Sequence, residues 1–134
     1  MTYELFLLAL CVWREARGAN YAVKLGVAWS IRNRVVNPGW WGATYEQVIT
    51  KAWQYTSMTG AGDPNLIAWP QGTSDPSWFD SIRAAQDAMA AKEADPVAGA
   101  THYYDNSIPP PAWTKANGSK HILDIPPMSF WKVD

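Results

Sequence analysis

The stretch that decides the fold is Met1-Thr-Tyr-Glu-Leu-Phe-Leu-Leu-Ala-Leu-Cys-Val-Trp-Arg-Glu-Ala-Arg-Gly18. Its middle is apolar on nearly every side, which is typical of a helix at the centre of a domain. Thr2 is a suitable N-cap and Gly18 a suitable stop, so we expect this helix to run to about Arg17. Glu15 therefore falls in the last turn of an apolar helix.

The same stretch resembles a signal peptide only at first sight. It has no basic leader region, carries Glu4, and continues into charged residues without a small-residue cleavage site. The apolar run is also too short to span a bilayer. We therefore expect a core helix of a protein that is made in the cytoplasm without a signal peptide, and no membrane partner.

Two further helices are predicted next along the chain. Asn20 can cap a helix over residues 21–36, which Asn37-Pro38-Gly39 would end. Thr44-Tyr-Glu-Gln47 fits a capping box that opens a short helix to about Trp53.

Residues 54–74 are rich in glycine and proline and predict a long loop, of the kind that is often functional or mobile. Asp75-Pro76 follows it and places a cap before a proline at the first helical position. We expect the helix that starts there to be closed by Asp95-Pro96.

The last third of the chain changes character. Residues 98–104 and 121–125 are short strand candidates, joined by a proline-rich loop over 108–114. A final extended piece, 128–133, is expected to pair with them. Helices followed by a small antiparallel sheet indicate an α+β fold, with residues 1–134 forming a single domain.

Composition excludes several classes of protein. A formal net charge of −1 argues against a nucleic-acid partner, which would need a clustered basic excess. The single cysteine, Cys11, excludes an internal disulfide framework and is expected to be buried. Only His102 and His121 are available as imidazole ligands, without a paired spacing, so we expect no metal and no cofactor.

Nine tryptophans stand out in a chain of 134 residues. Tryptophan is often half-exposed, because its N–H needs a partner when the ring is buried. Two interpretations stay open for them: a Trp-rich core with scattered surface rings, or a cleft whose aromatic faces stack on sugar rings.

Glu15 is the candidate for the chemistry. A carboxylate near the negative end of a helix dipole and close to buried surface is disfavoured in its ionised form, so its pKa should be raised. Cleavage of a glycosidic bond needs a donor that is still protonated near neutral pH. The alternative is a solvated carboxylate paired with Arg14 or Arg17.

Glu15-Ala-Arg-Gly18 at a helix end, followed by Asn33-Arg34-Val35 late in the next helix, resembles the cell-wall hydrolase family that includes bacterial spore cortex-lytic enzymes. Further elements similar to that family follow in the same order: Gln54-Tyr-Thr-Ser57, Gly99-Ala-Thr-His-Tyr103, Pro111-Ala-Trp113 and Lys120-His-Ile122. The resemblance spans nearly the whole chain.

The chain departs from the family pattern at three places. Ala19 stands where the family commonly has an acidic residue, and Arg14 stands where it tends to have a small one. Gly118 lies one residue further back from His121 than in the family.

The resemblance implies a lysozyme-like, helix-rich domain that cuts the MurNAc–GlcNAc bond of peptidoglycan as a lytic transglycosylase. Glu15 would protonate the leaving oxygen and then, as a carboxylate, take the proton of the muramyl C6 hydroxyl, which closes a 1,6-anhydro ring. The residues assigned to substrate binding are Tyr55, Thr56, Ser57, Thr101, Tyr103, Tyr104 and His121.

Some of these assignments also have a reason in the residues themselves. Thr56 and Ser57 can bond sugar hydroxyls or hold the Glu15 side chain, and ordinary capping of loop backbone groups is an equal alternative for each. Tyr103 and Tyr104 are neighbours on a predicted strand and should face opposite sides, one toward the core and one toward the cleft.

Two alternatives to the transglycosylase stay open. One is a water-using muramidase, in which Asp63 or Asp105 activates the water. The other is a non-catalytic wall-binding module that uses tryptophans as a sugar platform. The missing export signal and wall-binding domain favour a phage endolysin that a membrane pore releases onto the wall, or else a component of a phage particle. We expect the protein to be a monomer.

Overall fold

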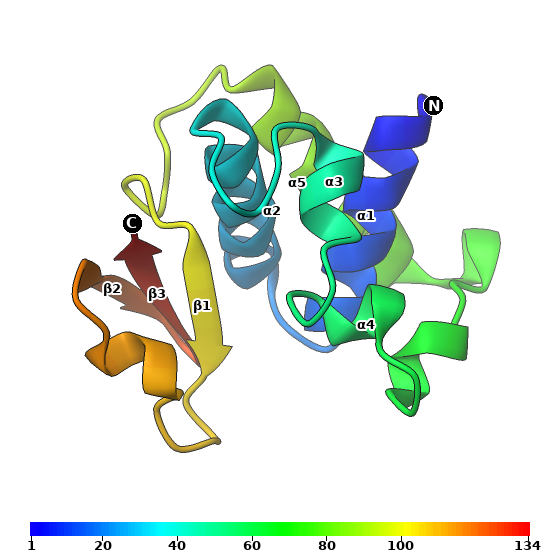
Figure 1. Ribbon diagram of the computed structural model, residues 1–134. Helices are drawn as coiled ribbons and strands as arrows, with labels where there is room; N and C mark the ends of the chain where they lie inside the picture. Colours follow the sequence, from blue (N-terminus) through cyan, green and yellow to red (C-terminus); the bar gives the residue numbers. More distant parts are fainter.

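Helix α1 (Tyr3–Ala16) packs against every other α-helix of the computed structural model, which describes residues 1–134 (Figure 1). The Thr2 hydroxyl caps it by accepting a hydrogen bond from the Leu5 N–H. Every residue from Leu7 to Arg14 is buried. The predicted central helix is thus confirmed, and it places Glu15 one residue before the helix ends.

Helix α2 (Tyr21–Val36) has the predicted bounds, and Asn20 caps it through the Val23 N–H. The capping threonine of α3 (Tyr45–Ile49) is Thr44, also as predicted. Helix α3 nevertheless ends at Ile49 and does not continue to Trp53, because the chain turns there and Trp53 adopts a left-handed conformation.

Asp75 caps α5 (Pro76–Ala90) through the Trp78 N–H. This helix ends earlier than predicted, because Ala91 takes a left-handed conformation with φ 50°. Asp95 instead organises the turn that follows: its carboxylate accepts hydrogen bonds from the N–H groups of Val97 and Gly99. The prediction that Asp95-Pro96 closes the helix was therefore wrong.

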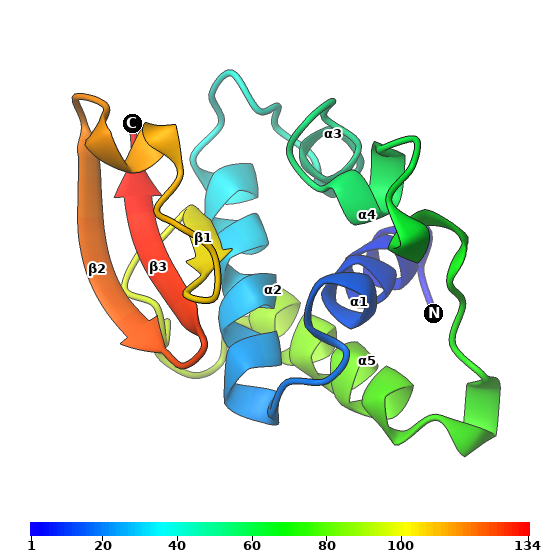
Figure 2. The ribbon, with the colours of Figure 1, turned by 90° about the horizontal axis from the view of Figure 1, so that it is seen from below.

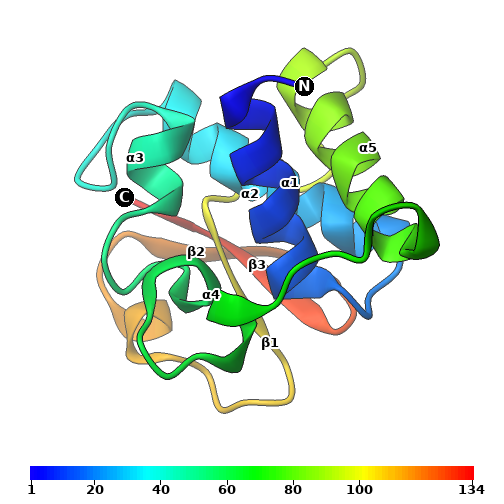
Figure 3. The same ribbon diagram turned by 90° about the vertical axis from the view of Figure 1, so that its right-hand side faces the viewer.

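The predicted loop over 54–74 contains three short helical turns, α4 (Thr56–Thr59), η1 (Pro64–Ile67) and η2 (Gly72–Ser74). Helix α4 lies beside the C-terminal end of α1 (Figure 3). The guanidinium group of Arg14 on α1 donates to the backbone oxygens of Ser57 and Ala68. This loop is therefore fastened to the helix that carries Glu15.

Three antiparallel strands form the sheet in the order β1-β3-β2, which confirms the α+β class. They are β1 (His102–Asp105), β2 (Ser119–Ile125) and β3 (Met128–Val133). Strand β1 begins later than the predicted residue 98, because Ala98 and Gly99 have positive φ values that a strand does not tolerate. The connection from β1 to β2 contains the turn η3 (Ala112–Lys115).

The sheet packs against α2, with α1 and α5 on the other side of that helix (Figure 2). Phe130 on β3 is fully buried, and its ring lies over Gly26 of α2. A Cβ atom at Gly26 would lie 2.8 Å from the Phe130 ring, 3.2 Å from Val97 and 3.3 Å from Ile125. The close approach of sheet and helix therefore requires a glycine. None of the helices has the length and apolar character that a membrane span requires.

We predict that Gly26→Ala lowers the free energy of unfolding by about 1 kcal/mol, since overpacking of a filled core outweighs the better helix propensity of alanine. Urea unfolding measures the change. Gly18→Ala is the matched control, because a Cβ atom there meets nothing within 4 Å. Equal stability of the two variants would show that the Phe130 ring moves aside freely.

Candidate active site

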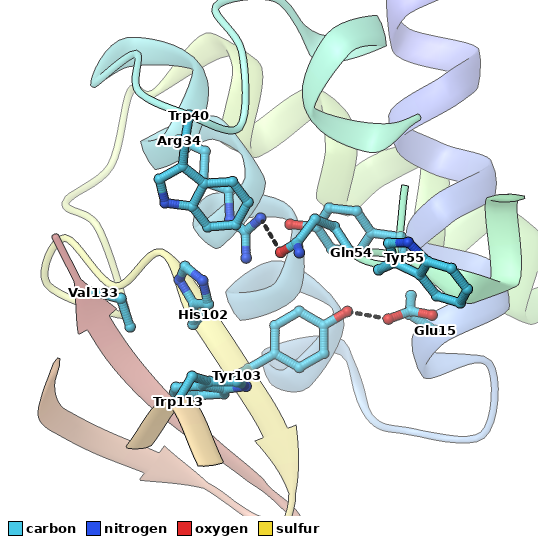
Figure 4. A pocket seen from close by; sticks show the side chains of 10 residues that line it. Glu15, Arg34, Trp40, Gln54, Tyr55, His102, Tyr103, Trp113 and Val133 are labelled. Atoms are coloured by element: carbon cyan, nitrogen blue, oxygen red, sulfur yellow. Dashed lines mark hydrogen bonds between the residues drawn. The ribbon is translucent and has the colours of Figure 1, made fainter. Parts of the chain in front are cut away.

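A cavity of about 270 Å³ lies between the helical layer and the sheet (Figure 4). Segments far apart in the sequence contribute to it: the end of α1, the end of α2, the chain around α4, strand β1 and turn η3. The lining residues are Glu15, Arg34, Trp40, Trp53, Gln54, Tyr55, His102, Tyr103, Trp113 and Val133.

Glu15 is the one carboxylic acid in this lining, and its side chain is half-buried. Burial raises its pKa, as expected from the sequence, and the charge of Asp63 acts in the same direction. Two hydroxyl groups, those of Tyr103 and Ser57, oppose the increase by stabilising the carboxylate. The net effect is a raised pKa, which favours the protonated acid.

Tyr103 on β1 reaches Glu15 across the cavity. Its hydroxyl donates a hydrogen bond to Glu15 Oε1 (Figure 4). Its ring lies 5.9 Å from the ring of Phe130, so one side chain belongs to both the core and the cavity. Burial and the Glu15 charge raise the Tyr103 pKa well above its usual value, so Tyr103 remains a hydrogen-bond donor.

Ser57 is buried, and its hydroxyl has no partner within hydrogen-bonding geometry. The Ser57 hydroxyl nevertheless opposes part of the rise in the Glu15 pKa that burial causes. A free hydroxyl beside the acid can therefore follow the change in its charge.

Arg34 brings a positive charge to the opposite wall. Its Nε donates to the Thr101 carbonyl oxygen at 2.6 Å, and one terminal nitrogen donates to Gln54 Oε1 at 3.1 Å. Its guanidinium carbon lies 5.3 Å from the centroid of the Tyr55 ring. Arg34 thus joins α2, the chain before α4 and the start of β1 at one point.

His102 is a neutral wall of the cavity. Burial and the charge of Arg34 lower its pKa to about 3. The pKa of the Tyr55 hydroxyl changes in the other direction: burial raises it. Among the groups in the cavity wall whose pKa is shifted, only Glu15 has a pKa that moves toward neutral pH. Glu15 is therefore the group suited to exchange a proton there.

Of the residues assigned to substrate binding, Tyr55 and Tyr103 line the cavity, and Ser57 lies near Glu15 without lining the cavity. Thr56 lines a second, neighbouring cavity and donates a hydrogen bond to Asp63 at 2.8 Å.

The remaining three lie elsewhere. Thr101 is buried, and its hydroxyl is 3.0 Å from His102 Nδ1. Tyr104 packs against Trp113 and Trp131 and does not line the cavity. The exposed His121 bonds to Asp124 on its own strand.

The structure excludes two arrangements of side chains near the cavity. His102 and His121 cannot meet across a hairpin, because both pair with Trp131 from opposite sides of β3. Arg17 does not orient Glu15: its guanidinium lies 4.0 Å from the Trp13 ring centroid and bonds to Asn65.

Sequence reasoning assigned no role in the cavity to Trp40, Trp53, Trp113 or Arg34. The sequence could have indicated Arg34 as a cavity residue. An arginine that is buried in the last turn of a helix needs hydrogen-bond acceptors, and polar groups of other segments must supply them. The tryptophans could not, because composition does not distinguish a ring in the core from one at the cavity. No group of three or more histidine, cysteine, aspartate or glutamate side chains is placed to hold a metal ion.

The sequence model of the family described as Cell Wall Hydrolase matches residues 18–131. This chain therefore belongs to the cell wall hydrolase family, a family of enzymes that degrade the cell wall. The matched range does not include Glu15, which lies just before it. No curated protein sequence is significantly similar to the chain.

Two solved structures share the fold. The catalytic domain of the SleB protein of Bacillus cereus has a TM-score of 0.74 at 24% identity, over 96% of this chain and 89% of that one. The catalytic domain of SleB from Bacillus anthracis, a germination-specific lytic transglycosylase, has a TM-score of 0.75 at 23% identity, over 98% of this chain and 96% of that one. At such identities the likeness concerns the fold.

We predict that Tyr103→Phe raises the pKa of Glu15 further, because it removes the hydroxyl that stabilises the carboxylate. An NMR titration of the Glu15 carboxyl carbon measures the shift. Tyr104→Phe is the control, since Tyr104 faces Trp113 and Trp131. Equal titration of Glu15 in both variants would contradict the role given to the Tyr103 hydroxyl.

A second prediction concerns stability and pH. The pKa of Glu15 is higher in the folded protein than the unfolded value of about 4.3, so the folded state loses stability as pH rises between the two. Glu15→Gln carries no such proton. Its melting temperature should exceed that of the wild type by an amount that grows with pH and levels off above the folded pKa. Thermal unfolding over a pH series tests this, and a constant difference would count against it.

Proposed function

We propose that this protein is a lytic transglycosylase that cuts the MurNAc–GlcNAc bond of peptidoglycan glycan strands with Glu15 as its one catalytic carboxyl group. The observation that carries the proposal is the cavity itself. It holds a single carboxylic acid with a raised pKa, and the other shifted groups in its wall do not titrate near neutral pH. The family and the fold of the chain support the same substrate class.

In the first step Glu15 acts as a general acid. The Tyr103 hydroxyl donates to Oε1, which leaves Oε2 to carry the proton and hand it to the bridging oxygen between the two sugars. The bond between that oxygen and the anomeric carbon breaks, and the leaving sugar departs with a new hydroxyl. Glu15 is now a carboxylate beside a positively charged anomeric centre.

In the second step the same carboxylate acts as a general base. It takes the proton of the muramyl C6 hydroxyl, whose oxygen closes onto the anomeric carbon and forms a 1,6-anhydro ring. Glu15 is protonated again, so the cycle closes without water. Tyr103 and Ser57 both favour the ionised carboxyl and therefore stabilise the state between the two steps.

A water-using muramidase would need a second carboxylate near the bond. Asp63 lines the neighbouring cavity, and its two oxygens accept from the Thr56 hydroxyl and the Asn65 N–H. Asp105 accepts from the Ser107 N–H in the turn after β1. Both carboxylates serve local structure and neither lines the Glu15 cavity, which favours the single-carboxyl mechanism.

Digestion of purified peptidoglycan by the wild type and Glu15→Gln, with product masses, tests the proposal. Glutamine keeps the shape of the side chain but cannot serve as the acid. We expect the wild type to give anhydro ends, one water lighter than reducing ends, and Glu15→Gln to lose activity by about 100-fold or more.

Glu46→Gln is the matched control, because Glu46 is exposed in the first turn of α3. It should cleave like the wild type. Products with reducing ends only would identify a muramidase instead. Full activity of Glu15→Gln would remove Glu15 from the chemistry, and binding of the wall without any cleavage by the wild type would identify a wall-binding module.

A further inference from the structure

Trp53 combines two unfavourable features. Its side chain is 87% exposed, so it contributes almost nothing to the core. Its backbone has φ 70°, a left-handed conformation that bulky side chains rarely adopt and that glycine adopts readily. Neither the packing nor the local backbone of the protein explains a tryptophan here, and strain of this kind often gathers at functional sites.

Trp53 also lies where two cavities meet. It lines the Glu15 cavity, and it lines the neighbouring cavity of about 780 Å³. No other residue lines both. A ligand that extends from Glu15 into the second cavity therefore has to pass this ring.

The second cavity has the chemistry of a site for neutral polyhydroxylated groups. Its polar lining residues are three threonines, one asparagine and Asp63, and Asp63 is the only charged residue among them. The full lining is Thr50, Ala52, Trp53, Thr56, Thr59, Gly60, Ala61, Asp63, Pro64 and Asn65. It contains no lysine or arginine, so it offers no positively charged partner to the carboxylates of a stem peptide.

We propose that Trp53 is a stacking platform that guides a glycan strand from the Glu15 cavity into the second cavity, which binds further sugars of the same strand. The inference rests on the proposed function, because it takes the strand to be the substrate. The C–H face of a sugar ring packs on the exposed indole, and the ring hydroxyls bond to Thr56, Thr59 and Asn65 beyond it. Trp53 is thus a residue that determines how much of the strand the enzyme holds.

Binding of glycan strands freed of stem peptides tests this inference, with Glu15→Gln as the background so that the strands stay intact. Calorimetry compares a tetrasaccharide with an octasaccharide, with and without Trp53→Gly. We expect the background protein to bind the octasaccharide more tightly, and Trp53→Gly to weaken octasaccharide binding about tenfold with little effect on the tetrasaccharide.

Trp53→Gly should melt no lower than the background protein, because glycine relieves the left-handed conformation. Ala91→Gly relieves the same kind of conformation on α5 and should leave glycan binding unchanged. Phe79→Ala removes another exposed aromatic ring, outside both cavities, with the same expectation. Trp53→Ala, which keeps the Cβ atom and loses the ring, should bind like Trp53→Gly.

Two results would overturn the inference: unchanged octasaccharide binding by Trp53→Gly, or equal losses for both lengths. Each differs from a failure of the proposed function, which would appear as cleavage of the strands by Glu15→Gln itself.

Discussion

Two buried polar side chains at the end of α2 join the halves of this molecule. Asn33 donates to the Ala100 carbonyl oxygen and to Asp95, and Arg34 donates to the Thr101 carbonyl oxygen. Removal of either would leave buried backbone acceptors without partners. These bonds fix the chain just before β1, so Tyr103 arrives opposite Glu15 from a position 88 residues away in the sequence.

The cavity that results is built from groups that do not favour stability. A carboxyl is held in a partly buried place that opposes its charge, a serine hydroxyl beside it lacks a partner, and Trp53 is both strained and exposed. These features lie along one cavity and its continuation, whereas the hydrophobic core consists of buried side chains. Such a concentration is what physical chemistry expects of a functional site, because the surrounding structure must supply the stability.

Much of the fold could be predicted from the sequence because it depends on local rules. The caps Thr2, Asn20 and Asp75 determine where helices start, and the predicted bounds of α2 agree with the structure. The errors fell where a residue other than glycine adopts a left-handed conformation that no sequence pattern announces. Ala91 ends α5, Ala98 precedes the late start of β1, and Trp53 lies in the turns that follow the short α3. Glu15 could be singled out because its environment follows from one helix. Its contact with Tyr103 depends on the order of strands in the sheet, which local patterns do not determine.

Arg14 shows how a departure from the family pattern can serve the same architecture. Its guanidinium donates to the carbonyl oxygens of Ser57 and Ala68 and lies 4.7 Å from the centroid of the Trp69 ring. A small residue at this position could not reach those acceptors. In this chain, therefore, the residue next to Glu15 holds the segment that carries Ser57 and the lining of the second cavity. Helix α1 thus carries the acid and also fastens that segment, so the two cavities keep their positions relative to each other. A glycan strand that occupies both cavities would require such a fixed arrangement.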